Sequence, residues 1–187
     1  MDHLSMGGKG GKCMKLYHTS DRIIQNPDIY HGRANADFGQ GFYLTPDRDF
    51  TYRWAAANAV VNEYELKEDG LDIFRFQRSV EWFEYIFHNR RREDRLKYDV
   101  IIGPIANDTI FDTMGIISSG FLSLEDALKL LLIGPEYTQA AVKSEQAARN
   151  LRWIGAEKIS RIDEEIRKKE EKEFQKEFAK VMEEIRR

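Results

Sequence analysis

Three side chains in this sequence are of a type and in a place that could bind a small ligand. His18 ends an expected first strand, Tyr43 lies in the next, and Gln139 begins a later one. Residues at strand ends can converge on one cleft even when they are far apart in sequence. An imidazole, a phenol and an amide together offer hydrogen-bonding groups and an aromatic face. The chemistry expected of them is the binding of a polar ligand that contains rings.

Two of these residues also have an ordinary structural explanation. His18 could cap its strand in the polar turn that follows, and Tyr43 could be a core aromatic residue on a strand.

Several other chemistries lack the spacing that they require. The glycines of residues 7–12 follow no strand, so they form no phosphate loop, and no Gly-x-Gly-x-x-Gly fingerprint follows a strand. His18, His31 and His88 show no i, i+4 pairing, so no metal site is expected. Cys13 is the only cysteine, which excludes an intramolecular disulfide and a cysteine-based metal cluster.

The elements that must position these residues alternate between short strands and helices. Thr45, Pro46 and an acid after them are typical of a helix start, and Phe50 and Val61 continue the helical spacing. Strands are predicted at residues 15–18, 42–45, 71–76, 98–106, 137–142 and 152–159. Helices are predicted at residues 46–62, 80–92, 127–133 and 144–151. Ser123 and the acids after it form a capping-box-like start for the third helix, and Ser144 can cap the fourth.

Composition and charge favour one domain with an appendage. The chain has 187 residues and is 42% hydrophobic, and its 29 basic and 32 acidic residues give a net charge of −3. Such a balance provides no basic field for nucleic acid or a membrane surface. Residues 1–13 are Gly- and Lys-rich and are interpreted as a tag remnant. Without an apolar span or a secretory signal, a cytoplasmic location is expected.

The predicted domain covers residues 14–159, and residues 160–187 are predicted to form a charged amphipathic helix. Acidic and basic residues are equally frequent in this tail, and its apolar residues share roughly one face. The tail is interpreted as a solvated helix packed on its own domain, with a partner-binding or self-associating helix as the alternative. The apolar face is interrupted at residues 169–173, which argues against a regular coiled coil.

Four segments together resemble one known family. They are residues 16–20 (LYHTS), 37–45 (DFGQGFYLT), 98–108 (YDVIIGPIAND) and 138–140 (TQA). In this order they resemble the DUF3990 family of ADP-ribosyltransferase-like proteins, over most of residues 14–159. The resemblance implies an α+β fold with two split antiparallel sheets around an NAD cleft, followed here by a long C-terminal helix.

The resemblance also implies an activity. NAD would be the substrate, ADP-ribose would pass to a macromolecular acceptor, and nicotinamide would leave. Bacterial relatives of this kind are often associated with toxin–antitoxin or phage-conflict settings, so a toxin-like effector is the expected role. An antitoxin or a second copy could then bind the C-terminal helix. The alternatives are a module that binds NAD or ADP-ribose without turnover, or a partner-binding module.

The resemblance assigns roles residue by residue. His18 would bind a ribose hydroxyl, the backbone of Thr19 the nicotinamide amide, and Tyr43 would stack on the nicotinamide ring. Gly39 and Gly41 would allow close backbone approach to NAD. The residues expected to contact NAD are His18, Thr19, Ser20, Gly39, Gly41, Phe42, Tyr43, Asn107 and Asp108. Asp108 could instead cap the next turn.

Gln139 stands where many active ADP-ribosyltransferases carry a glutamate. The resemblance therefore implies a His-Tyr-Gln variant of the His-Tyr-Glu class, with His18, Tyr43 and Gln139 as the expected catalytic set. The amide can hold a ribose hydroxyl but brings no full negative charge to an oxocarbenium-like transition state. The basic cluster at residues 90–92 and Arg95 could contact phosphates, but a solvated helix end is the favoured interpretation.

Overall fold

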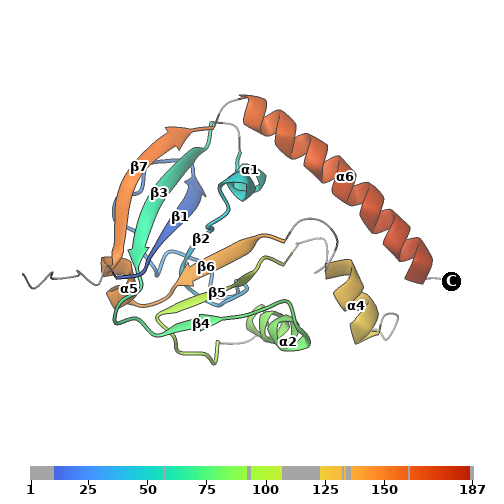
Figure 1. Ribbon diagram of the computed structural model, residues 1–187, viewed down its shortest axis with the longest axis horizontal. Coiled ribbons are helices and arrows are strands. Elements are labelled where there is room, and N and C mark those ends of the chain that lie inside the picture. The colour runs from blue at the N-terminus through green and yellow to red at the C-terminus, as the bar shows by residue number, and fades with distance from the viewer. Residues whose placement is uncertain are drawn as a thin grey trace, which may run out of the picture.

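Two β-sheets form the centre of the molecule (Figure 1). The computed structural model describes residues 11–56, 58–91, 94–106, 123–131, 133, 136–159 and 161–185. The first sheet has the order β1-β3-β7 and contains β1 (Cys13–Ser20), β3 (Val60–Lys67) and β7 (Leu151–Lys158), all antiparallel. The second has the order β2-β6-β5-β4 and contains β2 (Phe42–Leu44), β6 (Thr138–Val142), β5 (Val100–Pro104) and β4 (Ile73–Arg75). β1 begins at the last residue of the segment interpreted as a tag remnant.

A backbone bridge between Tyr17 and Thr45 joins the two sheets. The amide of Tyr17 donates to the carbonyl of Thr45 at 2.8 Å, and the amide of Thr45 donates back at 2.9 Å. Tyr17 lies in β1 and Thr45 directly follows β2. The bridge therefore brings the end of β1, with His18, beside Tyr43 of β2.

The apolar residues of β5 alternate between two cores. Val100 and Ile102 pack between the sheets with Leu16, Tyr64 and Leu66 of the first sheet. Ile101 faces the opposite way, into a second core formed with the helix α2 (Val80–Asn89). A strand covered on both faces needs apolar residues at successive positions. This explains why residues 98–106 form a continuous apolar run, and the strand predicted there is confirmed.

The predicted helix over residues 46–62 is wrong. The segment contains only a 3-10 helix η1 (Arg48–Phe50) and the short α1 (Thr51–Trp54). Asn58 then adopts a left-handed φ of 64°, and the chain enters β3 at Val60. From Asn62 onward, buried and more accessible residues alternate along β3. Pairing with strands on both sides thus prevails over the helical spacing of a few aromatic and aliphatic residues.

The expectation of two antiparallel sheets also needs correction, because the second sheet is mixed. β4 runs parallel to β5, with Ile73 opposite Val100 and Arg75 opposite Ile102. The two strands are joined through α2, and a parallel pair requires such a crossover because a tight turn can only reverse the chain. The fold is α+β, with two sheets and a long C-terminal helix.

The remaining predicted helices are confirmed, two of them with their caps. α4 (Leu124–Leu131) follows Ser123, whose hydroxyl accepts the amide of Asp126 at 3.1 Å. α5 (Glu145–Arg149) follows Ser144, whose hydroxyl accepts the amide of Ala147. These hydroxyls satisfy amides that have no partner within the helix. α2 ends at Asn89, three residues before its predicted end.

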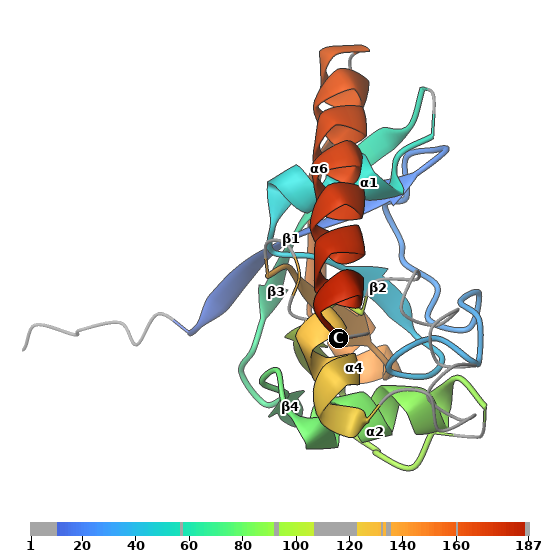
Figure 2. The ribbon, with the colours of Figure 1, turned by 90° about the vertical axis from the view of Figure 1, so that its right-hand side faces the viewer.

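The C-terminal helix α6 (Arg161–Ile185) lies along α1 and α4 (Figure 2). Phe174 is 7% exposed and packs against Leu130 and Ile133. Part of the apolar face of the tail is thus covered by its own domain, as predicted. None of the described helices is long and apolar enough to span a membrane.

Replacing Phe174 by alanine should release α6 from the domain. Removing a buried phenyl ring costs about 3 kcal/mol, and here that cost falls on the docking of one helix. Hydrogen exchange should show faster exchange of residues 161–185 with β1, β3 and β7 unchanged. Ile166→Ala is the matched control, because Ile166 is 45% exposed on the same helix. Equal protection of α6 in both variants would contradict this packing.

Candidate functional site

A cleft of about 1130 Å³ opens beside the bridge between the sheets. The end of β1, much of residues 21–37, β2, the two residues that follow β5 and the start of β6 line it. Predicted site residues that line it are His18, Thr19, Ser20, Gly41, Phe42, Tyr43 and Gln139. Gly39 is not among the lining residues. Asn107 and Asp108 lie outside the described residues, as does Arg92 of the basic cluster.

The imidazole of His18 is held in one tautomer. Its Nδ1 lies 2.6 Å from the backbone carbonyl oxygen of Tyr43, which can only accept, so Nδ1 carries the proton. Nε2 of the neutral ring is then an acceptor. Burial lowers the pKa of His18, and its ring packs on Phe42 with 4.3 Å between centroids. The site therefore contains a neutral imidazole that can accept a hydrogen bond from a hydroxyl.

The backbone of Thr19 points off the edge of the first sheet. Both backbone groups of Tyr17 point away from β3 toward Thr45. Backbone groups alternate in direction along a strand, so those of Thr19, two residues on, point to the same edge. Thr19 lines the cleft there. A ligand with one donor and one acceptor, such as a carboxamide, matches this edge.

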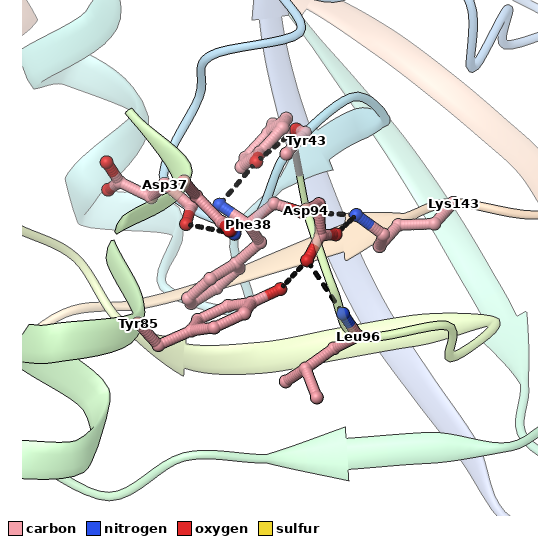
Figure 3. Close-up of polar contacts among 9 residues, drawn as sticks. Asp37, Phe38, Tyr43, Tyr85, Asp94, Leu96 and Lys143 are labelled. Carbon is pink, nitrogen blue, oxygen red and sulfur yellow. Dashed lines mark hydrogen bonds and ion pairs between the residues drawn. The ribbon is translucent and has the colours of Figure 1, made fainter. Parts of the chain in front are cut away.

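The hydroxyl of Tyr43 clamps the segment that precedes β2. It donates to the carbonyl of Gly39 at 2.7 Å and accepts the amide of Phe38 at 2.8 Å (Figure 3). Burial raises the pKa of Tyr43, so the phenol stays neutral. Tyr43 is among the residues that line the cleft, and its ring also packs against the second core with Phe38. Tyr43 thus offers an aromatic surface and also fixes residues 38–39.

The glycines of this segment are required by contacts within the protein. Gly39 has a φ of +75°, and a Cβ there would lie 2.8 Å from the Cβ of Asp94. A Cβ on Gly41 would lie 2.8 Å from the carbonyl oxygen of Val142. Real Cβ atoms do not approach so closely, so larger residues would displace the segment. Close packing against the protein is sufficient to explain both glycines.

Gln139 is almost fully buried, with 3% of its surface exposed. Its Nε2 donates to Asp37 Oδ2 at 2.8 Å and to the Pro104 carbonyl at 3.4 Å. Gln139 lies opposite Gly103 in the pairing of β6 with β5. The amide is therefore anchored on one side by a carboxylate and by the end of β5.

Sequence reasoning missed the functional position of Asp37 and Arg90. Asp37 is 7% exposed, and its Oδ1 lies 2.6 Å from Nε and 2.5 Å from Nη2 of Arg90. Arg90 caps the C-terminus of α2 and lines the cleft, so its interpretation as a solvated helix end is wrong. Two features of the sequence could have indicated this pair. They are an aspartate, Asp37, at the start of the DFGQGFYLT segment and a basic residue, Arg90, 53 positions later.

Two residues of β3 hold one wall of the cleft and were also missed. Asn62 is fully buried, donates from Nδ2 to the Arg22 carbonyl at 3.0 Å and accepts the amide of Ile24 at 2.9 Å. Tyr64 donates its hydroxyl to the Ile24 carbonyl at 2.5 Å. These bonds satisfy backbone groups of a segment that forms neither helix nor strand. The wall at residues 22–24 is thereby fixed to the first sheet.

Within the described part of the chain, no group of three or more His, Cys, Asp and Glu side chains is placed to hold a metal ion.

Fold and site together define an α+β protein with a polar cleft where its two sheets meet. Residues 14–153 match the family DUF3990, which is described as a protein of unknown function, and the chain belongs to this family. No curated protein and no solved structure matches the chain.

Acidification should weaken the fold through His18. In the unfolded chain histidine has a pKa of about 6.5, and burial lowers that of His18 in the folded protein. Protons therefore bind the unfolded state more readily, and the contribution of His18 to stability decreases as the pH falls below about 6.5. Urea unfolding at about pH 7.5 and about pH 5.5 should show a larger loss for wild type than for His18→Asn. Equal losses in the two proteins would contradict this assignment.

Proposed function

We propose that this protein is an NAD-dependent ADP-ribosyltransferase with the corresponding fold, a toxin-like effector that modifies a macromolecular acceptor. One observation carries the proposal. His18, Tyr43 and Gln139, drawn from three strands of both sheets, line a single cleft of about 1130 Å³. This volume is slightly above the range of ordinary small-ligand sites and leaves room for an extended dinucleotide.

The groups in the cleft suit the nicotinamide end of NAD. The edge backbone of Thr19 can accept and donate to the carboxamide, and the neutral His18 can accept from a ribose hydroxyl. The ring of Tyr43 can stack on the nicotinamide. Arg90, on the cleft surface, adds a cation near which phosphates can bind.

The proposed reaction breaks the glycosidic bond between the ribose C1′ and the nicotinamide nitrogen. The bonding electron pair goes to that nitrogen, neutral nicotinamide leaves, and positive charge develops on the ribose. An acceptor nucleophile then bonds to C1′ and loses a proton. The Oε1 atom of Gln139 accepts from a ribose hydroxyl and orients the sugar during this step.

The experiment is incubation of the protein with NAD labelled on the adenylate, alone and with a host lysate. We expect nicotinamide release and transfer of the label to macromolecules, which mass spectrometry then identifies. Binding is measured separately by the change in melting temperature with NAD. The proposal would be contradicted if the protein released no nicotinamide and NAD did not shift its melting temperature.

A second candidate is a module that binds NAD or ADP-ribose without turnover. The observation in its favour is that Gln139, a neutral amide, occupies the position at which a charged residue would stabilise the developing cation. This candidate predicts a shift in melting temperature with NAD and no nicotinamide release.

A partner-binding role of α6, toward an antitoxin or a second copy, predicts instead that removing residues 161–187 abolishes association.

A further inference from the structure

A buried carboxylate contacts the amide that is proposed to hold the reacting ribose. Asp37 Oδ2 accepts from Gln139 Nε2 at 2.8 Å. We propose that Asp37 supplies, through Gln139, the negative charge that the amide itself lacks. The inference rests on the proposed transferase function and makes Asp37 a positioning residue of that site.

The orientation of the Gln139 amide follows from its partners. Both groups that contact Nε2, the Asp37 carboxylate and the Pro104 carbonyl, act as acceptors. The NH₂ end must therefore face them, and the carbonyl Oε1 must lie at the other end. Among the described residues Oε1 accepts no hydrogen bond. It is available to the hydroxyl of a ligand in the cleft that Gln139 lines.

The two carboxylate oxygens of Asp37 have different partners. Arg90 binds Oδ1 through Nε and Nη2, whereas Gln139 binds Oδ2. Both oxygens are therefore held by donors at a site that is 7% exposed. The oxygen next to Gln139 is not the one that Arg90 holds. The Asp37 carboxylate can therefore polarise the amide and strengthen Oε1 as an acceptor.

Asp37 is not the only anchor of its segment. Its backbone carbonyl accepts from Asn89 Nδ2 at 3.1 Å, a bond that does not involve its side chain. The next residues are held by the Tyr43 hydroxyl and by the Lys143 ammonium, which contacts the Phe38 carbonyl (Figure 3). A change of the side chain alone therefore leaves these contacts in place. This makes an electrostatic role separable from a structural one.

The test exchanges the amide and the carboxylate between the two positions. Asp37→Asn should lower kcat for nicotinamide release about 10- to 100-fold, with little change in KM for NAD. This is less than the loss of about 100- to 1000-fold on removing a group that contacts the reacting atoms, because Asp37 acts through Gln139. Asp37→Asn combined with Gln139→Glu restores the charge on the opposite partner. The double variant should be at least about tenfold faster than Asp37→Asn. Asp49→Asn, an exposed aspartate outside the cleft, is the matched control.

The pH profile gives a second readout that a structural role would not change. Gln139→Glu alone places two carboxyl groups in contact, so the pair retains one proton and kcat acquires a new titration. The double variant lacks that titration because position 37 is then an amide. This comparison remains decisive where Asp37→Asn alone does not fold.

Three results would overturn the inference. They are a kcat of Asp37→Asn within about twofold of wild type, a double variant no faster than Asp37→Asn, or no new titration in Gln139→Glu. In each case the wild type still releases nicotinamide, so the proposed function stands. A wild type that binds NAD and releases none would overturn the proposed function and this inference with it.

Discussion

Replacing Lys143 by methionine is expected to lower the free energy of unfolding by about 3–5 kcal/mol. This is the cost of leaving the other member of a buried ion pair charged and without a partner of opposite charge. The Lys143 ammonium contacts the Asp94 carboxylate and the Phe38 carbonyl. Their side chains are 11% and 13% exposed, for Lys143 and Asp94 respectively. Methionine fills a similar volume and removes the charge. Among the described residues, Asp94 would then keep two neutral donors, the Tyr85 hydroxyl at 2.5 Å and the Leu96 amide at 3.0 Å.

Urea unfolding followed by circular dichroism measures this loss. Lys129→Met is the matched control, because Lys129 pairs with Asp126 at the surface and its loss should change stability little. Asp94→Asn in the Lys143→Met background removes the unpaired charge and keeps an acceptor for Tyr85. This second change should restore part of the stability. If Lys143→Met were as stable as Lys129→Met, the buried pair would not stabilise the fold.

Replacing Tyr43 by alanine is expected to lower nicotinamide release about 100-fold, the scale on which misplacing a substrate slows a reaction. The change removes the aromatic surface proposed to stack on nicotinamide. It also removes the hydroxyl that binds the Phe38 amide and the Gly39 carbonyl. Both the ligand and the segment before β2 would lose a fixed position.

Tyr43→Phe separates the two contributions, because it keeps the ring and removes only the hydroxyl. If the ring makes the larger contribution, Tyr43→Phe retains most of the activity. If the hydrogen bonds of the hydroxyl to residues 38–39 make the larger contribution, Tyr43→Phe and Tyr43→Ala are equally slow. Release of nicotinamide, the melting temperature and its shift with NAD are measured for each variant. A folded Tyr43→Ala protein with wild-type release would contradict the role of this residue.

These two predictions concern one shared network (Figure 3). The Lys143 ammonium and the Tyr43 hydroxyl both bind backbone groups of residues 38–39, and Asn89 binds the carbonyl of Asp37. The segment that carries the Asp37 side chain into the cleft is thus held from β2, β6 and α2. A site held in this way keeps its groups in place before a ligand arrives, which lowers the ordering cost of binding.

The missed strand β3 shows how two local patterns can compete. Phe50, Trp54 and Val61 are spaced as on a helix, and Thr45-Pro46 is typical of a helix start. The period-two alternation of residues 62–67 favours a strand instead. The left-handed φ of Asn58 interrupts any helix before β3 begins. Whether such a segment becomes a strand depends on partners, and here β1 and β7 supply them.

The elements that the sequence alone determined are those whose signals are local. Apolar continuity identified β5, serine caps identified the starts of α4 and α5, and amphipathic spacing identified α6. Local signals also placed His18, Tyr43 and Gln139 on or beside strands, and all three line the cleft. Such signals depend on neighbours within a few residues, so they survive without knowledge of the fold.

Only the tertiary structure decided how the chemistry is arranged. The Asp37 side chain contacts Arg90, which is 53 residues away in the sequence, and Gln139, which is 102 residues away. The mixed second sheet and the fixing of residues 22–24 by Asn62 and Tyr64 are equally non-local. An ion pair or a buried amide forms where burial removes water and leaves one available partner. Which partner a buried group contacts therefore depends on how the elements pack, and no local sequence pattern predicts it.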